Sequence, residues 1–269
     1  MPRTHPLYKQ LFRIWRQTGR WLPGGWLDAI RQLALFAGAY YLYRIVRGFI
    51  DGQAGLAFEN ARALVDIERS LGLFFEPSLQ AWAKGQEWIL TFANWMYVNS
   101  HFTVSVVFLA WLYLFRNDNF YFVRNMFMVA MGIALVGYAL FPTAPPRMLP
   151  GDGFTDTIAS FTSVDQDSNA VSLLVNKYAA VPSMHIGFSS MIAGTAVMLV
   201  RNPVGRFLWA LYPLLVFWVI VVTANHYWLD AAAGLLVAIV SALVASRVLA
   251  PVRPAQWAFR PAVPEEAAA

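Results

Sequence analysis

The chain has 269 residues, of which 58% are hydrophobic and only 13% are charged. A soluble domain carries about 25% charged residues, so this composition indicates a membrane protein and excludes an ordinary soluble domain. Cysteine is absent, which excludes disulfides and cysteine-ligated metals, and the net charge of +5 comes without any basic run that would bind nucleic acid.

The apolar segments predict the fold. A spanning helix needs about 20 mostly apolar residues. Six segments meet or approach this length: Ile30–Ile50, Trp88–Phe115, Phe120–Phe141, Ile186–Val200, Phe207–Val222 and Leu229–Leu249. We therefore expect an all-α membrane protein whose residues 30–250 form a bundle of six transmembrane helices. A basic N-terminal segment (residues 1–29) precedes the bundle, and a disordered tail (residues 251–269) follows it.

The basic residues set the expected orientation. With both termini in the cytoplasm, 13 Lys and Arg residues lie inside and 7 lie outside. The two short loops at Arg116–Arg124 and Arg201–Arg206 are basic, and both fall inside. We expect the terminal segments to be cytoplasmic and the protein to lie in the plasma (inner) membrane.

Two long segments lie on the expected outer side. Asp51–Glu87 carries apolar residues at nearly helical spacing, namely Phe58, Leu64, Ile67 and Leu71. This spacing predicts an interfacial helix resting on the outer membrane surface, and a helix packed over the bundle fits equally well. Pro142–Pro182 is polar and long enough to be a lid or a binding loop.

A polar stripe follows the second predicted helix, where Asn94, Tyr97, His101 and Ser105 recur every three or four residues. Ionisable groups near the middle of a membrane usually face a cavity. Asn94, Tyr97 and His101 are therefore candidate cavity-lining residues. For His101 an interhelical hydrogen-bond seam is slightly favoured.

Three polar clusters interrupt the apolar pattern: Pro142–Arg147, Val181–His185 and Asn225–Asp230. In the six-helix topology all three lie at the outer ends of helices. This common position was not used to count the helices, so it independently predicts a single site on the outer face.

The first cluster ends in Arg147. Its planar guanidinium suits a phosphate, although it could equally bind lipid headgroups at the interface. Lys177 is a second candidate cation. In the second cluster, Pro182-Ser183 is a helix start signal, and the backbone N–H groups of a helix start bind anions. His185 lies in that first turn, where it could donate a proton to a leaving oxygen or serve as an ordinary capping histidine.

The third cluster carries the strongest candidate nucleophile. His226 and Asp230 are four residues apart, so on a helix they would share a face. A carboxylate that accepts the proton of one imidazole nitrogen leaves the other nitrogen free to attack. The plainer alternative is an interfacial histidine beside a capping aspartate.

Pro182-Ser183-x-His185 followed by His226-x-x-x-Asp230 resembles the type 2 phosphatidic acid phosphatase superfamily, over Pro142 to about Gly234. The resemblance implies a six-helix membrane bundle and a reaction that needs no metal or other cofactor. It also implies that His226 is the nucleophile, that Asp230 orients it and that His185 is the general acid.

The chain departs from the usual pattern of this superfamily. Leu140 stands where the first motif has lysine, Met148 where proline follows the arginine, and Ile220 where the third motif has arginine. The segments around Arg147 and His226 are more similar to the divergent branch that includes inositol phosphorylceramide synthases, which transfer the phosphoryl headgroup to a lipid alcohol. Ser183, Asn225 and Lys177 are the candidates for further phosphate donors.

Two functions compete. The first is a lipid phosphate phosphatase or phosphotransferase acting through a phosphohistidine at the outer face. The second is a protein that binds or transports lipid phosphates without turnover. A transporter would be expected to show internal repeats, and none is visible. The expected partners are a lipid phosphate substrate and membrane lipids, without nucleic acid. The pattern does not specify the oligomeric state.

Overall fold

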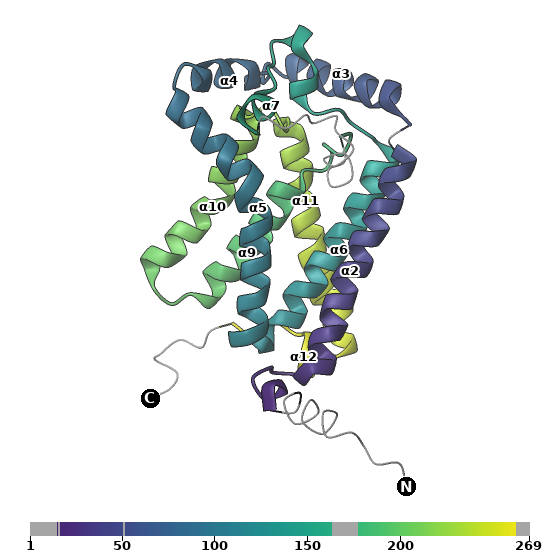
Figure 1. Ribbon diagram of the computed structural model, residues 1–269, viewed down its shortest axis with the longest axis vertical. Helices are drawn as coiled ribbons and strands as arrows, with labels where there is room; N and C mark the ends of the chain where they lie inside the picture. Colours follow the sequence, from purple (N-terminus) through teal and green to yellow (C-terminus); the bar gives the residue numbers. More distant parts are fainter. Residues whose placement is uncertain (1–14, 16, 51, 163–176, 262–269) are drawn as a thin grey trace, which may run out of the picture.

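The computed structural model describes residues 15, 17–50, 52–162 and 177–261. Long helices run side by side along the molecule, and shorter helices lie across one end of them (Figure 1). The long helices are α2 (Gly25–Ile50), α5 (Glu87–Phe115), α6 (Asn117–Leu140), α9 (Met184–Leu199), α10 (Pro203–Val222) and α11 (Trp228–Val244). Their positions match the six predicted segments closely, and the all-α membrane fold is confirmed.

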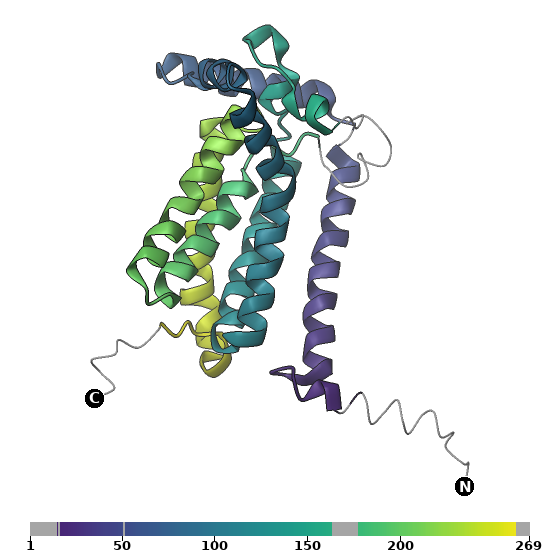
Figure 2. The same ribbon diagram turned by 60° about the vertical axis from the view of Figure 1, so that its left-hand side comes forward.

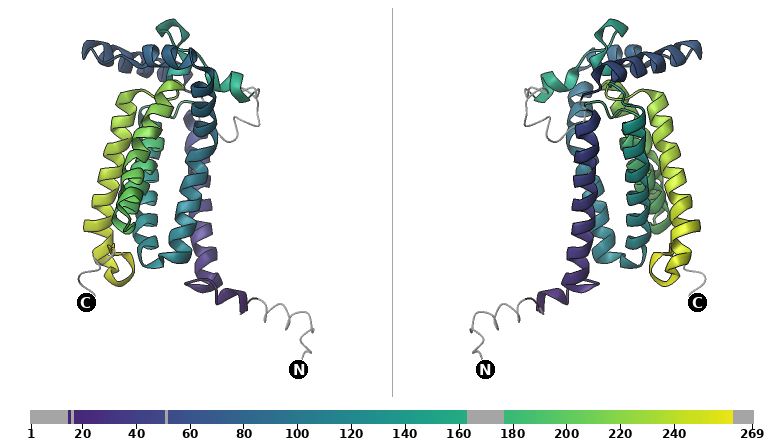
Figure 3. Two further views of the ribbon diagram at one scale, coloured as in Figure 1. Left: turned by 90° about the vertical axis from the view of Figure 1, so that its left-hand side faces the viewer. Right: turned by 90° about the vertical axis from the view of Figure 1, so that its right-hand side faces the viewer.

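The number of spans stays a prediction. Among the described residues, α5, α6, α10 and the stretch Trp228–Val252 are long and apolar enough to cross a membrane. Helix α9 is apolar but has only 16 residues. Helix α2 packs against α6 at the edge of the bundle (Figures 2 and 3), and its charged residues, among them Arg31 and Arg44, make it more polar than those four stretches.

Three short helices cover one end of the bundle, which we call the cap end: α3 (Ala54–Ser70), α4 (Glu76–Lys84) and α7 (Thr157–Thr162) (Figure 1). Two helices, α3 and α4, thus occupy the segment where one interfacial helix was expected, and Gly72 in the intervening turn has a φ of +68°. Helix α3 buries Leu64 and Val65 against Phe154 and Tyr227, so it packs over the bundle end. Ile67 and Leu71, predicted on its apolar face, are exposed.

The core between α5, α6, α9 and α11 is built from large apolar side chains such as Leu112, Phe127 and Ile192. Helices α9 and α11 pack directly against each other beside the second and third motifs. A Cβ atom at Gly234 would lie 2.1 Å from the carbonyl oxygen of Ser183. Glycine at this position therefore lets α9 begin directly against α11.

The segment after residue 250 corrects a prediction. It was expected to be disordered from residue 251, but α12 (Pro254–Trp257) forms there, followed by Phe259. The Phe259 ring packs at 5.3 Å from Phe122, and Asn119 exchanges two hydrogen bonds with the backbone of Arg260. These contacts hold residues 251–261 against the bundle, so the expectation of disorder is wrong for them. Residues 262–269 lie outside the described residues.

Candidate active site

The three polar clusters come together at the cap end through main-chain contacts. The Arg147 N–H donates to the carbonyl of Ala224 at 2.7 Å, which joins the first cluster to the turn before the third. The Ser183 N–H donates to the carbonyl of Asp230 at 3.0 Å, which joins the second cluster to the third. The structure therefore places on one end of the bundle the residues that were predicted to form one site.

A tight turn positions His226. Helix α10 ends at Val222, and Ala224 adopts a left-handed conformation with a φ of 52°. The N–H groups of Asn225 and His226 then both donate to the carbonyl of Ile220, which folds the chain back before α11 begins. The spacing predicted that His226 and Asp230 share the face of one helix. His226 instead precedes the helix, so the two residues do not lie on a common helical turn.

The contact between His226 and Asp230 is nevertheless present. Asp230 Oδ2 lies 3.1 Å from His226 Nδ1 and also accepts the N–H of Tyr227 at 3.1 Å. The side chains of His226 and Asp230 are 6% and 0% exposed. A carboxylate in this position requires the proton on Nδ1, so Nε2 carries the lone pair that a nucleophile needs.

His185 lies on the other side of that lone pair. Its Nδ1 is 3.1 Å from His226 Nε2. Since His226 Nε2 is the acceptor, His185 Nδ1 is the donor in this pair. The His185 ring also stacks on Tyr97 of α5, with the ring centroids 4.8 Å apart. Asp230, His226 and His185 therefore form a continuous hydrogen-bonded chain with a lateral aromatic support.

The polar stripe on α5 divides into two parts. His101 contacts His185, with the ring centroids 4.2 Å apart, and its buried Nδ1 has no hydrogen-bond partner among the described residues. The hydrogen-bond seam favoured for His101 is therefore not seen at that nitrogen. Asn94 instead exchanges two hydrogen bonds with Thr157, so it fastens α7 to the bundle.

Arg147 is held by two neighbours. Its guanidinium donates to Asn225 Oδ1, and its Nε lies 3.6 Å from a carboxylate oxygen of Asp156. The Asn225 amide in turn donates to the carbonyl and the hydroxyl of Thr223. Asn225 thus orients Arg147, and its direct binding to phosphate stays a prediction. Neither Asp156 nor Thr223 was predicted, because nothing local distinguishes them from ordinary loop and helix-end residues.

Ser183 lies at the start of α9 without capping it. It occupies the N-cap position, but its side chain makes no cap hydrogen bond, and its fully buried Oγ has no partner among the described residues. The first N–H groups of α9 therefore lack a side-chain cap beside His185. Such groups, together with the helix dipole, favour an anion.

The structure also describes the remaining candidate cation and two of the positions where the chain departs from the usual motifs of the superfamily. Lys177 lies two residues before Ala179, which forms an isolated bridge with Thr143. Its role in phosphate binding stays a prediction. Leu140 is 77% exposed on the flank of α6, and Ile220 is fully buried in the core.

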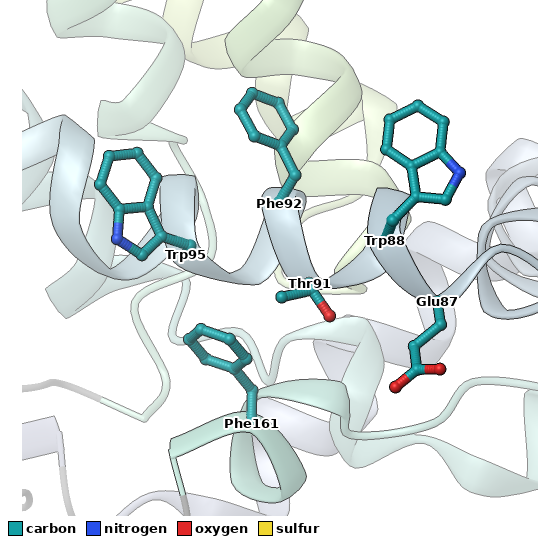
Figure 4. A pocket seen from close by; sticks show the side chains of 6 residues that line it. All are labelled: Glu87, Trp88, Thr91, Phe92, Trp95 and Phe161. Atoms are coloured by element: carbon teal, nitrogen blue, oxygen red, sulfur yellow. The ribbon is translucent and has the colours of Figure 1, made fainter.

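A groove lies on the flank of α5, lined by Glu87, Trp88, Thr91, Phe92, Trp95 and Phe161 (Figure 4). Trp88, Phe92 and Trp95 project from the same side of the helix, and all three are exposed. The groove contains none of the site residues. Its exposed tryptophans are typical of an aromatic belt at a membrane interface.

The fold defines a class of protein, namely a membrane-embedded helical bundle, and its cap end holds two adjacent histidines and a buried carboxylate. The model of the PAP2 superfamily matches residues 62–244, which is more than half of the chain, and the chain belongs to this superfamily. No curated protein and no solved structure matches it. The match confirms the predicted family and supports phosphatase- or phosphotransferase-type activity on lipid phosphate. The divergent branch with inositol phosphorylceramide synthases stays a prediction.

Proposed function

We propose that this protein transfers a phosphoryl group from a membrane-embedded lipid phosphate through a covalent phosphohistidine at His226. The observation that supports this proposal most strongly is the series of hydrogen bonds from Asp230 through His226 to His185, with both contacts at 3.1 Å. The acceptor is water in a phosphatase and an alcohol in a phosphotransferase.

Phosphate binding rests on groups that converge beside the two histidines. Arg147 supplies a positive charge held in a fixed orientation by Asn225 and Asp156. Ser183 Oγ and the uncapped start of α9 supply hydrogen-bond donors. A phosphate bound by these groups would lie between Arg147 and the helix start, within reach of His226.

In the first step, His226 Nε2 attacks phosphorus, and the bond between phosphorus and the lipid oxygen breaks. His185, protonated on both ring nitrogens in this step, gives one proton to that oxygen and becomes neutral, so the lipid leaves as an alcohol rather than as an alkoxide. Asp230 stabilises the positive charge that develops on the His226 ring. The phosphorus needs the space between the two histidine nitrogens, so binding must move the His185 ring away from His226.

In the second step, His185 is neutral and accepts a proton from water or an alcohol. The oxygen of that molecule attacks phosphorus, and the bond between phosphorus and His226 Nε2 breaks. Both histidines then return to their starting protonation states. The same two residues thus act in reverse roles in the two steps.

The decisive experiment is lipid profiling by mass spectrometry before and after adding the purified protein, with and without polyol acceptors. We expect a lipid phosphate to be consumed by the wild type and not by His226→Ala. A dephosphorylated lipid identifies water as the acceptor, and a new phosphodiester identifies an alcohol. Identical lipid profiles with wild type and His226→Ala would leave the alternative, a protein that binds lipid phosphate without turnover. The absence of the usual cations at positions 140 and 220 is the observation that favours this alternative.

We also propose that the reaction needs no divalent ion, because the site sets a single carboxylate, Asp230, directly beside its histidines. Activity should persist in chelator and be inhibited by vanadate, which adopts the five-coordinate geometry of attacked phosphorus. Loss of activity in chelator with recovery on adding Zn²⁺ or Mg²⁺ would contradict this.

We further propose that the cap end faces outward and that both terminal segments lie in the cytoplasm. Because the chain contains no cysteine, single cysteines at the exposed positions Asp66, in the cap, and Asn202, at the other end, give unambiguous labelling sites. An impermeant thiol reagent should reach position 66 and not 202 in intact cells. The reverse pattern would invert the topology.

A further inference from the structure

Two buried glutamates from the cap hold the start of α11. Glu76 of α4 accepts the N–H of Trp228 at 3.1 Å, and Glu68 of α3 accepts the N–H of Leu229 at 3.2 Å. Both glutamates are 0% exposed. These two N–H groups belong to the only two residues between Tyr227 and Asp230, so the glutamates act inside the segment that carries the candidate nucleophile and its carboxylate.

Three consecutive N–H groups at this helix start are thus bound by three different carboxyl groups. The N–H of Tyr227 donates to Asp230, that of Trp228 to Glu76 and that of Leu229 to Glu68. The positive end of the helix dipole favours negative charge at this place. It does not require two further carboxyls, because a Ser or Asn side chain would cap the same N–H groups.

The two carboxyls are buried on the N–H groups of adjacent residues, and the second oxygen of each, Oε2, has no hydrogen-bond partner among the described residues. Two ionised carboxylates in a buried site lose their hydration and repel each other, so burial favours the protonated form of one of them. Burial, and then the neighbouring Glu76, raises the pKa of Glu68 to about 9. Both effects favour one proton on the pair at neutral pH.

The charged and titratable groups around the pair come from three elements. Asp230 and Tyr227 lie near it at the start of α11, and Asp152 of the 3-10 helix Pro150–Asp152, which is paired with Arg69 of α3, lies near Tyr227. No salt bridge in the described part of the chain joins Glu68 or Glu76 to a cation. The absence of a basic partner there also favours a proton on the pair.

We propose that Glu68 and Glu76 are positioning residues that share one proton, and that the singly charged pair fixes the start of α11 so that Asp230 keeps its contact with His226. For its activity readout this inference rests on the proposed function. Removal of the proton would place two negative charges side by side in a buried site. Their repulsion would release the N–H groups of Trp228 and Leu229 and loosen the contact between Asp230 and His226.

The substitution Glu68→Gln separates this role from simple capping. Glutamine keeps an oxygen for the Leu229 N–H and an amide that donates to Glu76, but it carries no titratable proton. Glu76→Gln is the reciprocal variant. Glu59→Gln is the matched control, because Glu59 lies on the same helix α3 with an exposed side chain.

The shared proton is tested first, without turnover. Infrared spectra of the full-length protein at neutral pH should contain the C=O band of a protonated carboxylic acid. The band should persist in Glu59→Gln and disappear in Glu68→Gln. A band that is unchanged in both Glu68→Gln and Glu76→Gln would overturn the shared proton.

Unfolding gives a second test of the same proton. Since the pKa of Glu68 is raised from 4.5 to about 9 in the folded chain, folding retains a proton that the unfolded chain releases. The free energy of unfolding should therefore fall as the pH rises from about 4.5 to about 9 and change little above that. Glu68→Gln should flatten this fall relative to Glu59→Gln, and an equal slope in both would count against the pair.

The positioning role is tested by the rate as a function of pH, on an aryl phosphate that leaves without protonation by His185. The wild-type rate should decline at alkaline pH. In Glu68→Gln the rate at neutral pH should stay within about threefold, and the alkaline decline should move up by roughly one pH unit or more. Wild-type profiles in both glutamine variants would reduce the pair to a static cap and overturn the proposal. If the wild type hydrolyses no phosphate ester, the proposed function fails, and the pH dependence of vanadate binding by the same variants replaces the rate.

Discussion

Two clusters of buried polar side chains lie at opposite ends of the bundle, and they differ in how well their atoms are paired. At the end away from the cap, Arg124 donates to Gln32 and Asn125, while Asp28 accepts from Gln32 and Tyr121. The Arg124 guanidinium also lies 5.2 Å from the Tyr121 ring centroid. This cluster ties α2 to α6 through contacts that are complete without any ligand.

The polar cluster at the cap end is, in contrast, incompletely hydrogen-bonded. Several are buried and have no partner among the described residues: Ser183 Oγ, His101 Nδ1, Asp230 Oδ1, Glu68 Oε2 and Glu76 Oε2. Leaving a buried polar atom unpaired costs about 1–3 kcal/mol, so such atoms need an explanation. A saturated cluster serves the fold, whereas an unsaturated one is suited to a substrate or a shared proton.

The largest expected effect separates the two histidines of the cap end. His226→Ala should abolish turnover of every phosphate ester, because it removes the nucleophile. His185→Ala should lose about 10²–10⁴-fold on a lipid phosphate and regain much of that loss on an aryl phosphate, whose leaving group needs no proton. Steady-state rates on one substrate of each kind decide this. If the aryl phosphate restored the rate of His226→Ala but not that of His185→Ala, His185 would be the nucleophile and His226 the general acid.

A smaller loss is expected for Asp230→Asn. The imidazole of His226 remains, but its tautomer and its positive charge in the intermediate are less well held. The rate should fall between that of wild type and that of His226→Ala on both substrates. A wild-type rate on both would mean that the 3.1 Å contact with His226 has no part in turnover.

Packing beneath the cap end is tested by Gly234→Ala. The added methyl group would meet the Ser183 carbonyl at 2.1 Å, so α9 and α11 must move apart. Overpacking of this kind costs typically about 1–3 kcal/mol of stability and should also lower activity by shifting Ser183. Gly132→Ala on α6 is the control, since nothing lies within 4 Å of the added atom there. Thermal unfolding and rate measurements on both variants check this, and equal behaviour would contradict the close approach.

The smallest effect on turnover is expected at the opposite end. Arg124→Ala leaves the oxygens of Gln32 and Asn125 without their donor and should destabilise the protein by about 1–3 kcal/mol. The rate per folded molecule should stay near that of wild type, because the cluster contacts no site residue. A large loss of rate with unchanged stability would contradict the view that this cluster serves only the fold.

The helices were predictable because a membrane span has a required length and polarity. The segment Trp88–Phe115 differs from α5 by one residue at its start, and Ile30–Ile50 differs from α2 only at its start. The tail was misjudged because the Pro- and Ala-rich composition conceals two aromatic residues that pack on the bundle, Trp257 against the Arg124 guanidinium and Phe259 against the Phe122 ring.

The site was predictable where its residues form local motifs, as for His185, His226 and Asp230. It was not predictable where distant segments meet. Glu76 and Trp228 are 152 positions apart, and no spacing rule connects them. Glu68 did leave a local signal, because it continues the buried face of α3 after Ala57, Ala61, Leu64 and Val65. A lone carboxylate on such a face needs a partner, but the pattern does not say which.

The 3.1 Å contact between His185 Nδ1 and His226 Nε2 has a consequence for the resting protein. The lone pair that would attack phosphorus is occupied by a neighbouring N–H as long as no phosphate is bound. In the proposed mechanism, the nitrogen becomes reactive only when a bound anion draws His185 away. The residue that is proposed to assist the reaction would then also shield the proposed nucleophile from stray electrophiles between turnovers.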